Sequence, residues 1–148
     1  MKKLVIIDDV NTKDNDSIEQ FRTLASEFGY ETVVVEDQCS DSMEEFSENF
    51  LKMETEGPDA LPLNEELVKA MEGAEIVVTV MSALPTAAIN ASDNLKAACI
   101  MRSGVENINL ENATKRGVKV INAPGRLAVP VSEFTVGLMI AEMKNIAR

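Results

Sequence analysis

Short runs of β-branched and other apolar residues, separated by stretches of helical periodicity, constrain the fold of this 148-residue chain most strongly. The first run, Leu4-Val5-Ile6-Ile7, is continuously apolar, which is typical of a parallel strand covered on both faces. Strands are predicted at residues 4–7, 32–35, 75–80, 95–101 and 118–121. Because helical patterns lie between these runs, the sequence predicts an α/β fold with a mainly parallel sheet.

The intervening stretches carry helix start and stop signals. Helices are predicted over residues 17–28, 40–56, 64–71, 85–93 and 110–116. The candidate N-caps are Asp16, Asn64 and Asn109, Pro85 is a first-turn signal, and Gly29 and Gly117 are candidate ends. The alternation predicts a flavodoxin-like, doubly wound five-stranded sheet with helices on both faces. Ligands of such sheets bind beyond the carboxyl ends of the strands, so the loops after residues 7, 80, 101 and 122 are the expected functional edge.

The C-terminal segment is apolar on nearly every side. Residues 131–148 predict a long helix in which Phe134, Val136 and Met139 cannot all face one core. We therefore expect a domain over residues 1–130 followed by a helix that another domain or subunit covers. A homodimer through helix 131–148 is the corresponding assembly prediction.

Charge and cysteine content narrow the function classes. The net charge is −11, with −14 in residues 1–75 and +3 in residues 76–148, so nucleic acid is a poor partner. No run of about 18 apolar residues predicts a membrane span, and the apolar stretch near the N-terminus is too short for a signal peptide. Cys39 and Cys99 are far apart, and Cys99 lies in an apolar run. A buried, reduced Cys99 and a cytoplasmic location are expected.

Three motifs in the C-terminal half carry the chemical information. They are Ser103-Gly104-Val105-Glu106-Asn107, Gly117 through Pro124, and Glu133-Phe134-Thr135. Gly104 lies where a strand passes into a loop at the ligand edge, and a glycine there lets backbone amides face an anion. A plain strand-to-helix turn is the alternative interpretation. The acidic residues of the N-terminal half are interpreted as solvated helix faces, whereas Arg102 and Arg126 lie near the motifs and can attract an anionic small molecule.

These motifs, at this spacing, resemble the D-isomer-specific 2-hydroxyacid dehydrogenases, the superfamily of formate and phosphoglycerate dehydrogenases. The resemblance implies that the amides of Ser103 and Gly104 hold the carboxylate of a small 2-hydroxy or 2-keto acid. It also implies a pocket lined by Met81, Ser82, Arg102 and Arg126, and a cofactor cleft bordered by Asn107 and Thr135.

The same resemblance implies half of an enzyme. The family's catalytic arginine, glutamate and histidine, and its glycine-rich loop for NAD or NADP, lie beyond the point where this chain stops. We therefore expect a substrate-binding half without catalytic residues or a tightly bound cofactor, and without turnover by itself. The chain contains no histidine, so an imidazole cannot transfer the proton that hydride chemistry needs.

Two departures from the family pattern concern the substrate. Phosphoglycerate dehydrogenases commonly carry an arginine where this chain has Met81, so a phosphorylated substrate is disfavoured. Leu127 stands where several related enzymes have an asparagine. Arg126 beside it either serves an anionic substrate or is a surface arginine.

Other function classes fit less well. No phosphate-binding Walker loop, Cys/His metal cluster or Ser-His-Asp triad is present. Asp8 and Asp9 resemble the paired acids of receiver domains, but an aspartate after the third strand and a lysine after the fifth are missing. We interpret both acids as residues that solvate a turn and cap the next helix. A non-catalytic, self-associating α/β binding module remains the alternative.

Overall fold

Five strands form one sheet in which every neighbouring pair is parallel. The computed structural model describes residues 2–10, 12, 16–37 and 42–146. The strands are β1 (Lys2–Asp8), β2 (Tyr30–Glu36), β3 (Ile76–Thr79), β4 (Ala97–Ile100) and β5 (Lys119–Ile121). Their order across the sheet is β2-β1-β3-β4-β5, which is the flavodoxin-like order. The five predicted strands are confirmed.

Helices fill the connections between the strands, and one more helix follows the last strand. They are α1 (Ser17–Glu27), α2 (Met43–Glu56), α3 (Glu65–Met71), α4 (Thr86–Asn90), α5 (Leu110–Lys115) and α6 (Ala128–Met143), with a 3₁₀ turn, η1 (Pro58–Ala60), before α3. The Asn64 and Asn109 side chains accept the backbone N–H groups of Leu67 and Asn112, so both predicted N-caps are confirmed. The predicted Asp16 cap is wrong. Its backbone angles, φ −75° and ψ 8°, lie outside the extended region from which a side chain reaches the first-turn amides.

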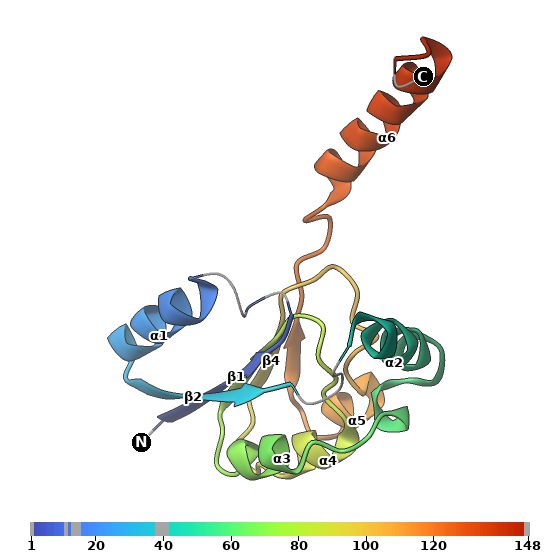
Figure 1. Cartoon of the computed structure of the whole chain (residues 1–148). Helices are drawn as coiled ribbons and strands as arrows, with labels where there is room; N and C mark the ends of the chain where they lie inside the picture. Colours follow the sequence, from blue (N-terminus) through green and yellow to red (C-terminus); the bar gives the residue numbers. More distant parts are fainter. Residues whose placement is uncertain (1, 11, 13–15, 38–41, 147–148) are drawn as a thin grey trace.

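The two faces of the sheet are covered unequally (Figure 1). Leu67 and Met71 of α3, Ile89 of α4 and Ala113 of α5 pack with one face of the sheet into the larger core. On the other face α1 covers the smaller core, around Ile6. Both cores exclude water from apolar side chains, which is the main stabilising term of the fold.

Incomplete coverage explains the environment of Cys99. Cys99 of β4 lines an apolar groove of about 250 Å³ between α1 and the sheet, together with Phe21, Phe28 and Val78. The thiol is half-buried rather than fully buried as expected, because α1 leaves this part of β4 open. Partial burial raises the pKa of Cys99, so the thiol is protonated near neutral pH. Cys39 lies outside the described residues.

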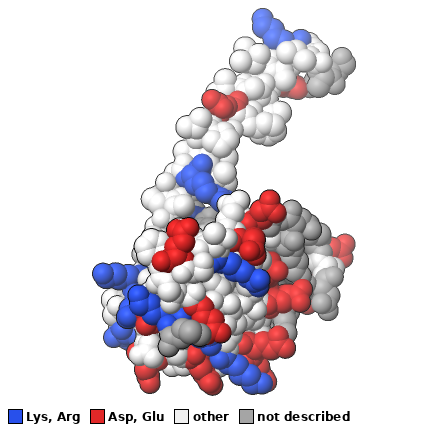
Figure 2. All heavy atoms as spheres, turned by 90° about the vertical axis from the view of Figure 1, so that its left-hand side faces the viewer, with Lys and Arg blue, Asp and Glu red and all other residues white. Residues whose placement is uncertain are grey.

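Helix α6 extends away from the sheet (Figure 1) and carries few charges along its surface (Figure 2). It begins at Ala128 and ends at Met143, so it is shorter than the predicted 131–148 segment, whose last two residues lie outside the described range. None of its residues is buried, and Phe134 is 68% exposed. Among the described helices, none has the length and apolar character needed to cross a membrane.

A side-chain cluster connects η1, α4 and the start of α5. The carboxylate of Asp59 accepts the Thr86 N–H at 2.6 Å, the Thr86 hydroxyl at 2.8 Å and the Asn109 side-chain amide at 2.6 Å. Burial alone would raise the pKa of Asp59, but the hydrogen bonds from Asn109 and Thr86 outweigh it and hold the pKa below its usual 3.8. The folded state therefore stabilises the ionised carboxylate.

Asp59→Ala is expected to lower the free energy of unfolding at pH 7 by about 1 kcal/mol, because the first turn of α4 loses its cap. Since the folded pKa lies below the unfolded one, this contribution is fully present above pH 3.8 and is lost as the pH falls through the folded pKa. Urea denaturation at neutral and acidic pH checks it. Asp16→Ala is the matched control, because the Asp16 side chain makes no cap hydrogen bond, and it should change the free energy of unfolding little at either pH. Equal losses of unfolding free energy in the two variants would contradict the role of Asp59 as a cap of α4.

Candidate functional site

The carboxyl ends of β1, β3 and β4 place three polar segments side by side. Asp9 follows β1, residues 80–84 follow β3, and residues 101–107 follow β4. The last two segments are joined by main-chain bonds, since the Leu84 N–H donates to the Asn107 carbonyl at 2.7 Å. This is the edge of the sheet at which a ligand is expected.

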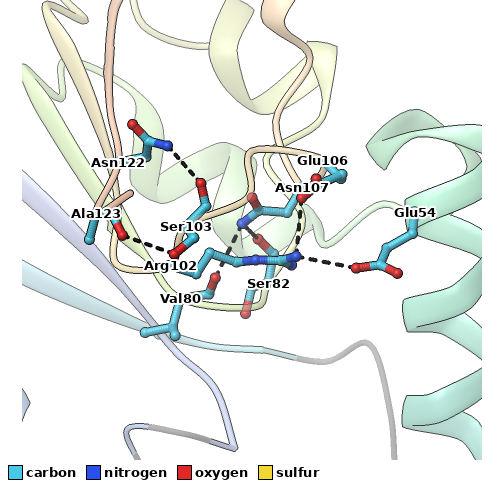
Figure 3. A network of polar contacts seen from close by, with 9 residues as sticks. All are labelled: Glu54, Val80, Ser82, Arg102, Ser103, Glu106, Asn107, Asn122 and Ala123. Atoms are coloured by element: carbon cyan, nitrogen blue, oxygen red, sulfur yellow. Dashed lines mark hydrogen bonds and ion pairs between the residues drawn. The ribbon is translucent and has the colours of Figure 1, made fainter. Parts of the chain in front are cut away.

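Two buried side chains hold the loop at residues 80–82 from opposite sides. The Asp9 carboxylate, 1% exposed, accepts the N–H groups of Met81 at 2.6 Å and Ser82 at 3.3 Å. The fully buried Asn107 amide donates to the carbonyls of Ser82 at 3.0 Å and Val80 at 3.5 Å (Figure 3). The loop is thus fixed through both its donors and its acceptors. Our interpretation of Asp9 as a solvated turn residue was wrong, because its side chain is enclosed by the loop after β3.

Ser82 and Met81 face the region under α2. The buried Ser82 hydroxyl donates to the Asp37 carboxylate at 2.7 Å. Met81 lines a gap of about 20 Å³ with Phe46 and Phe50 of α2. The gap has room for about one water molecule. Its lining is mainly apolar, with the Asp37 carboxylate at one side, and among the described residues it includes no cationic side chain.

The loop at residues 102–104 is held through its carbonyl oxygens. The Arg102 carbonyl accepts the Ala123 N–H at 3.0 Å. The Ser103 carbonyl accepts the Asn122 side-chain amide at 2.7 Å (Figure 3). In a trans peptide the N–H group points opposite to the preceding carbonyl. The N–H groups of Ser103 and Gly104 therefore point away from residues 122–123. Within the described residues, neither N–H donates a hydrogen bond.

Arg102 lies between α2 and this loop. Its Nη2 atom is 3.2 Å from a Glu54 carboxylate oxygen and 3.1 Å from a Glu106 carboxylate oxygen (Figure 3). The guanidinium carbon is 5.2 Å from the centre of the Phe50 ring, within cation–π range. The side chain is only 14% exposed, and its buried Nη1 atom has no acceptor among the described residues.

The structure brings together most of the residues that the sequence singled out. Met81, Ser82, Arg102, Ser103, Gly104 and Asn107 lie on the two joined loops. Arg126 and Thr135 lie outside them: Arg126 is exposed in the turn before α6, and the Thr135 hydroxyl donates to Val131 in its own helix. Asn107 has no exposed surface, and its amide nitrogen donates to the loop at residues 80–82.

Sequence reasoning missed three residues of this site: Asp9, Glu54 and Glu106. The position of Asp9 after the first strand was a usable signal, since β1 lies next to β3 in a flavodoxin-like order. Glu54 gave no signal, because it is one of several acids in α2. In the described part of the chain, no group of acidic, cysteine or histidine side chains has the arrangement of a metal site.

Comparisons with known proteins match this chain to one family. Residues 32–145 match the catalytic domain of the D-isomer-specific 2-hydroxyacid dehydrogenases. The chain is 36% identical to the hydroxypyruvate reductase of Thermotoga maritima over 85 residues, which are 57% of this chain and 28% of that protein. It is also 36% identical to the D-3-phosphoglycerate dehydrogenase of Methanocaldococcus jannaschii over 83 residues, 55% of this chain and 16% of that one.

The fold is similar to that of solved structures as well. An NAD⁺-bound 3-phosphoglycerate dehydrogenase of Entamoeba histolytica superposes with a TM-score of 0.64 and 17% sequence identity, over 95% of this chain and 39% of that one. The matched regions amount to less than a third of the length of the two curated relatives.

Proposed function

Since the chain belongs to the D-isomer-specific 2-hydroxyacid dehydrogenase family, we propose that it is the substrate-binding part of an NAD(P)-dependent enzyme of this kind. In the proposal, the N–H groups of Ser103 and Gly104 hold the carboxylate of a small 2-hydroxy or 2-keto acid. A cytoplasmic location is part of the same proposal, in keeping with the free thiol of Cys99.

The observation that carries this proposal is the pair of adjacent N–H groups without an acceptor. Both lie at the carboxyl end of β4, where the carbonyls of residues 102 and 103 are already bonded to the loop at 122–123. Unpaired backbone donors are costly unless water or a ligand accepts from them, and a carboxylate is a stronger acceptor than water. The backbone geometry thus favours an anion over a neutral ligand.

The surroundings favour a small acid without a phosphate. Met81 supplies no cation with which a phosphate could pair. Arg102 and Ser82 are proposed to line the pocket, and Arg126 to approach the acid from the turn before α6.

The contacts that the family resemblance implies between a nicotinamide cofactor and Asn107 or Thr135 stay predictions. Asn107 has no exposed surface, and the Thr135 hydroxyl is bonded within its own helix. We assign Asn107 instead to positioning the loop at residues 80–82. No tight NAD or NADP binding and no turnover are proposed for this chain by itself, since cofactor enzymes need the cofactor and the substrate positioned together.

A two-dimensional NMR titration of the ¹⁵N-labelled chain with pyruvate tests the carboxylate site. The N–H signals of Ser103 and Gly104 are expected to shift downfield and to saturate, with a Kd of about 1 mM. Methyl pyruvate, which lacks the carboxylate, is the matched ligand control and should not shift them. The Gly73 N–H, far from the site in a turn at the end of α3, serves as the internal control. Saturable shifts confined to other regions, or none, would contradict the proposal.

A second proposal concerns α6. Its exposed apolar side chains favour a homodimer in which the helices of two copies cover one another. This helix corresponds to the segment predicted at residues 131–148, after a domain of residues 1–130. In a longer protein, a nicotinamide-binding domain is the other proposed occupant. Without the acid site, the same helix would make the chain a self-associating, non-catalytic module.

A further inference from the structure

The Glu106 carboxylate lies directly against the Gly104 α-carbon. A β-carbon built on Gly104 would overlap Glu106, so glycine is the residue that permits this approach. The backbone of Gly104 is outside the left-handed region, so the small size of glycine matters here rather than its conformational freedom. The carboxylate is held there by Arg102 at 3.1 Å.

An acid bound to the Gly104 N–H would come close to this carboxylate. With an N–Cα bond of about 1.5 Å and a hydrogen bond of about 2.9 Å, the acid oxygen lies within about 4.4 Å of the Gly104 α-carbon. Two carboxylates near one α-carbon repel each other, and more strongly at a partly buried position than in water.

Arg102 has two carboxylate partners and one unsatisfied group. Glu54 of α2 and Glu106 share the Nη2 atom, while the buried Nη1 atom has no acceptor among the described residues. A buried N–H without an acceptor is unfavourable, and an incoming carboxylate could supply that acceptor. Glu54 and the Phe50 ring would keep the guanidinium beside the loop if Glu106 left.

We propose that Glu106 is an internal competitor that sets the affinity of the site for acids: it occupies the space beside Gly104 and Arg102 until a substrate carboxylate displaces it. The proposal rests on the proposed carboxylate site and adds its regulation. Glu106 is 46% exposed, so its side chain can swing into solvent without unfolding the loop. Arg102 then pairs with the bound acid instead.

The test is the pyruvate titration repeated on Glu106→Gln. This variant keeps the shape of the side chain and removes its charge, and pyruvate is expected to bind about tenfold more tightly. Glu54→Gln removes the same charge from the same guanidinium but leaves Glu106 beside Gly104, so its affinity should rise less than about threefold. Glu111→Gln is the matched control, since it breaks a similar pair with Lys115 four residues away on α5 and should leave the affinity unchanged.

The outcomes separate this inference from the proposed function. If pyruvate shifts the Ser103 and Gly104 signals of the unmodified chain but Glu106→Gln binds no more tightly, the inference is wrong and the carboxylate site stands. If the affinity for pyruvate rises equally in Glu54→Gln and Glu106→Gln, the effect comes from net charge, and the inference about Glu106 is also wrong. If neither chain shows the shifts, both proposals fail. The spectrum of each variant reports at once whether it is folded.

Discussion

Asp9→Ala is expected to lower the free energy of unfolding by about 3 kcal/mol at pH 7. The Asp9 side chain is 1% exposed and accepts the N–H groups of Met81 and Ser82, which are 72 and 73 residues away in sequence. Alanine would leave both N–H groups without their charged acceptor and would open a cavity beneath the loop. Each unsatisfied buried donor costs about 1–3 kcal/mol.

Urea denaturation followed by circular dichroism measures this loss. Asp8→Ala is the matched control, since the neighbouring Asp8 carboxylate accepts only the Thr12 hydroxyl, at 2.7 Å, among the bonds described. Its expected cost is about 1 kcal/mol. A loss for Asp9→Ala no larger than that for Asp8→Ala would refute the role of Asp9 in holding the loop.

Replacing both Phe134 and Leu138 with glutamate is expected to weaken self-association of the chain at least about 100-fold, because burying unpaired charges at an apolar interface costs several kcal/mol. The two residues lie four positions apart on α6 and therefore on one side of the helix. They are 68% and 56% exposed in the single chain.

Sedimentation equilibrium of the parent chain and of the double variant measures the association constant. The matched control replaces Leu24 and Phe28, two exposed apolar residues four positions apart at α1, with glutamate. This control should leave association through α6 unchanged. A parent chain that stays monomeric at tens of micromolar, or equal weakening in both double variants, would overturn the proposal that α6 forms the interface.

Local sequence patterns predicted the elements of this fold well, for a physical reason. The apolar run at Leu4–Ile7 and the N-cap signals at Asn64 and Asn109 act within a few residues, and the structure confirms all three. Helix α6 shows the limit of such patterns. Its first turn includes Ala128 and Val129, three residues earlier than predicted, because Pro130 is compatible with the first turn of a helix.

The candidate site was predictable only in part. The motif around Gly104 identified the loop and the resemblance identified the family, which the match over residues 32–145 shows. The cofactor contacts expected of Asn107 and Thr135 stay predictions, while the burial of Asn107 and the intrahelical bond of Thr135 depend on the whole fold. The contacts of Asp9 and Glu106 could not be predicted from the sequence for the same reason, since they too depend on the whole fold.

The amino-acid sequence alone determined the order of strands and helices and the loop that carries Ser103 and Gly104, because periodicity, capping and turn residues act over short distances. The tertiary structure alone decided which loops meet. Only the neighbouring positions of β1 and β3 place the Asp9 carboxylate on the amides of residues 81 and 82. Only the packing of α2 beside the loop gives Arg102 its partner Glu54, which is 48 residues away along the chain.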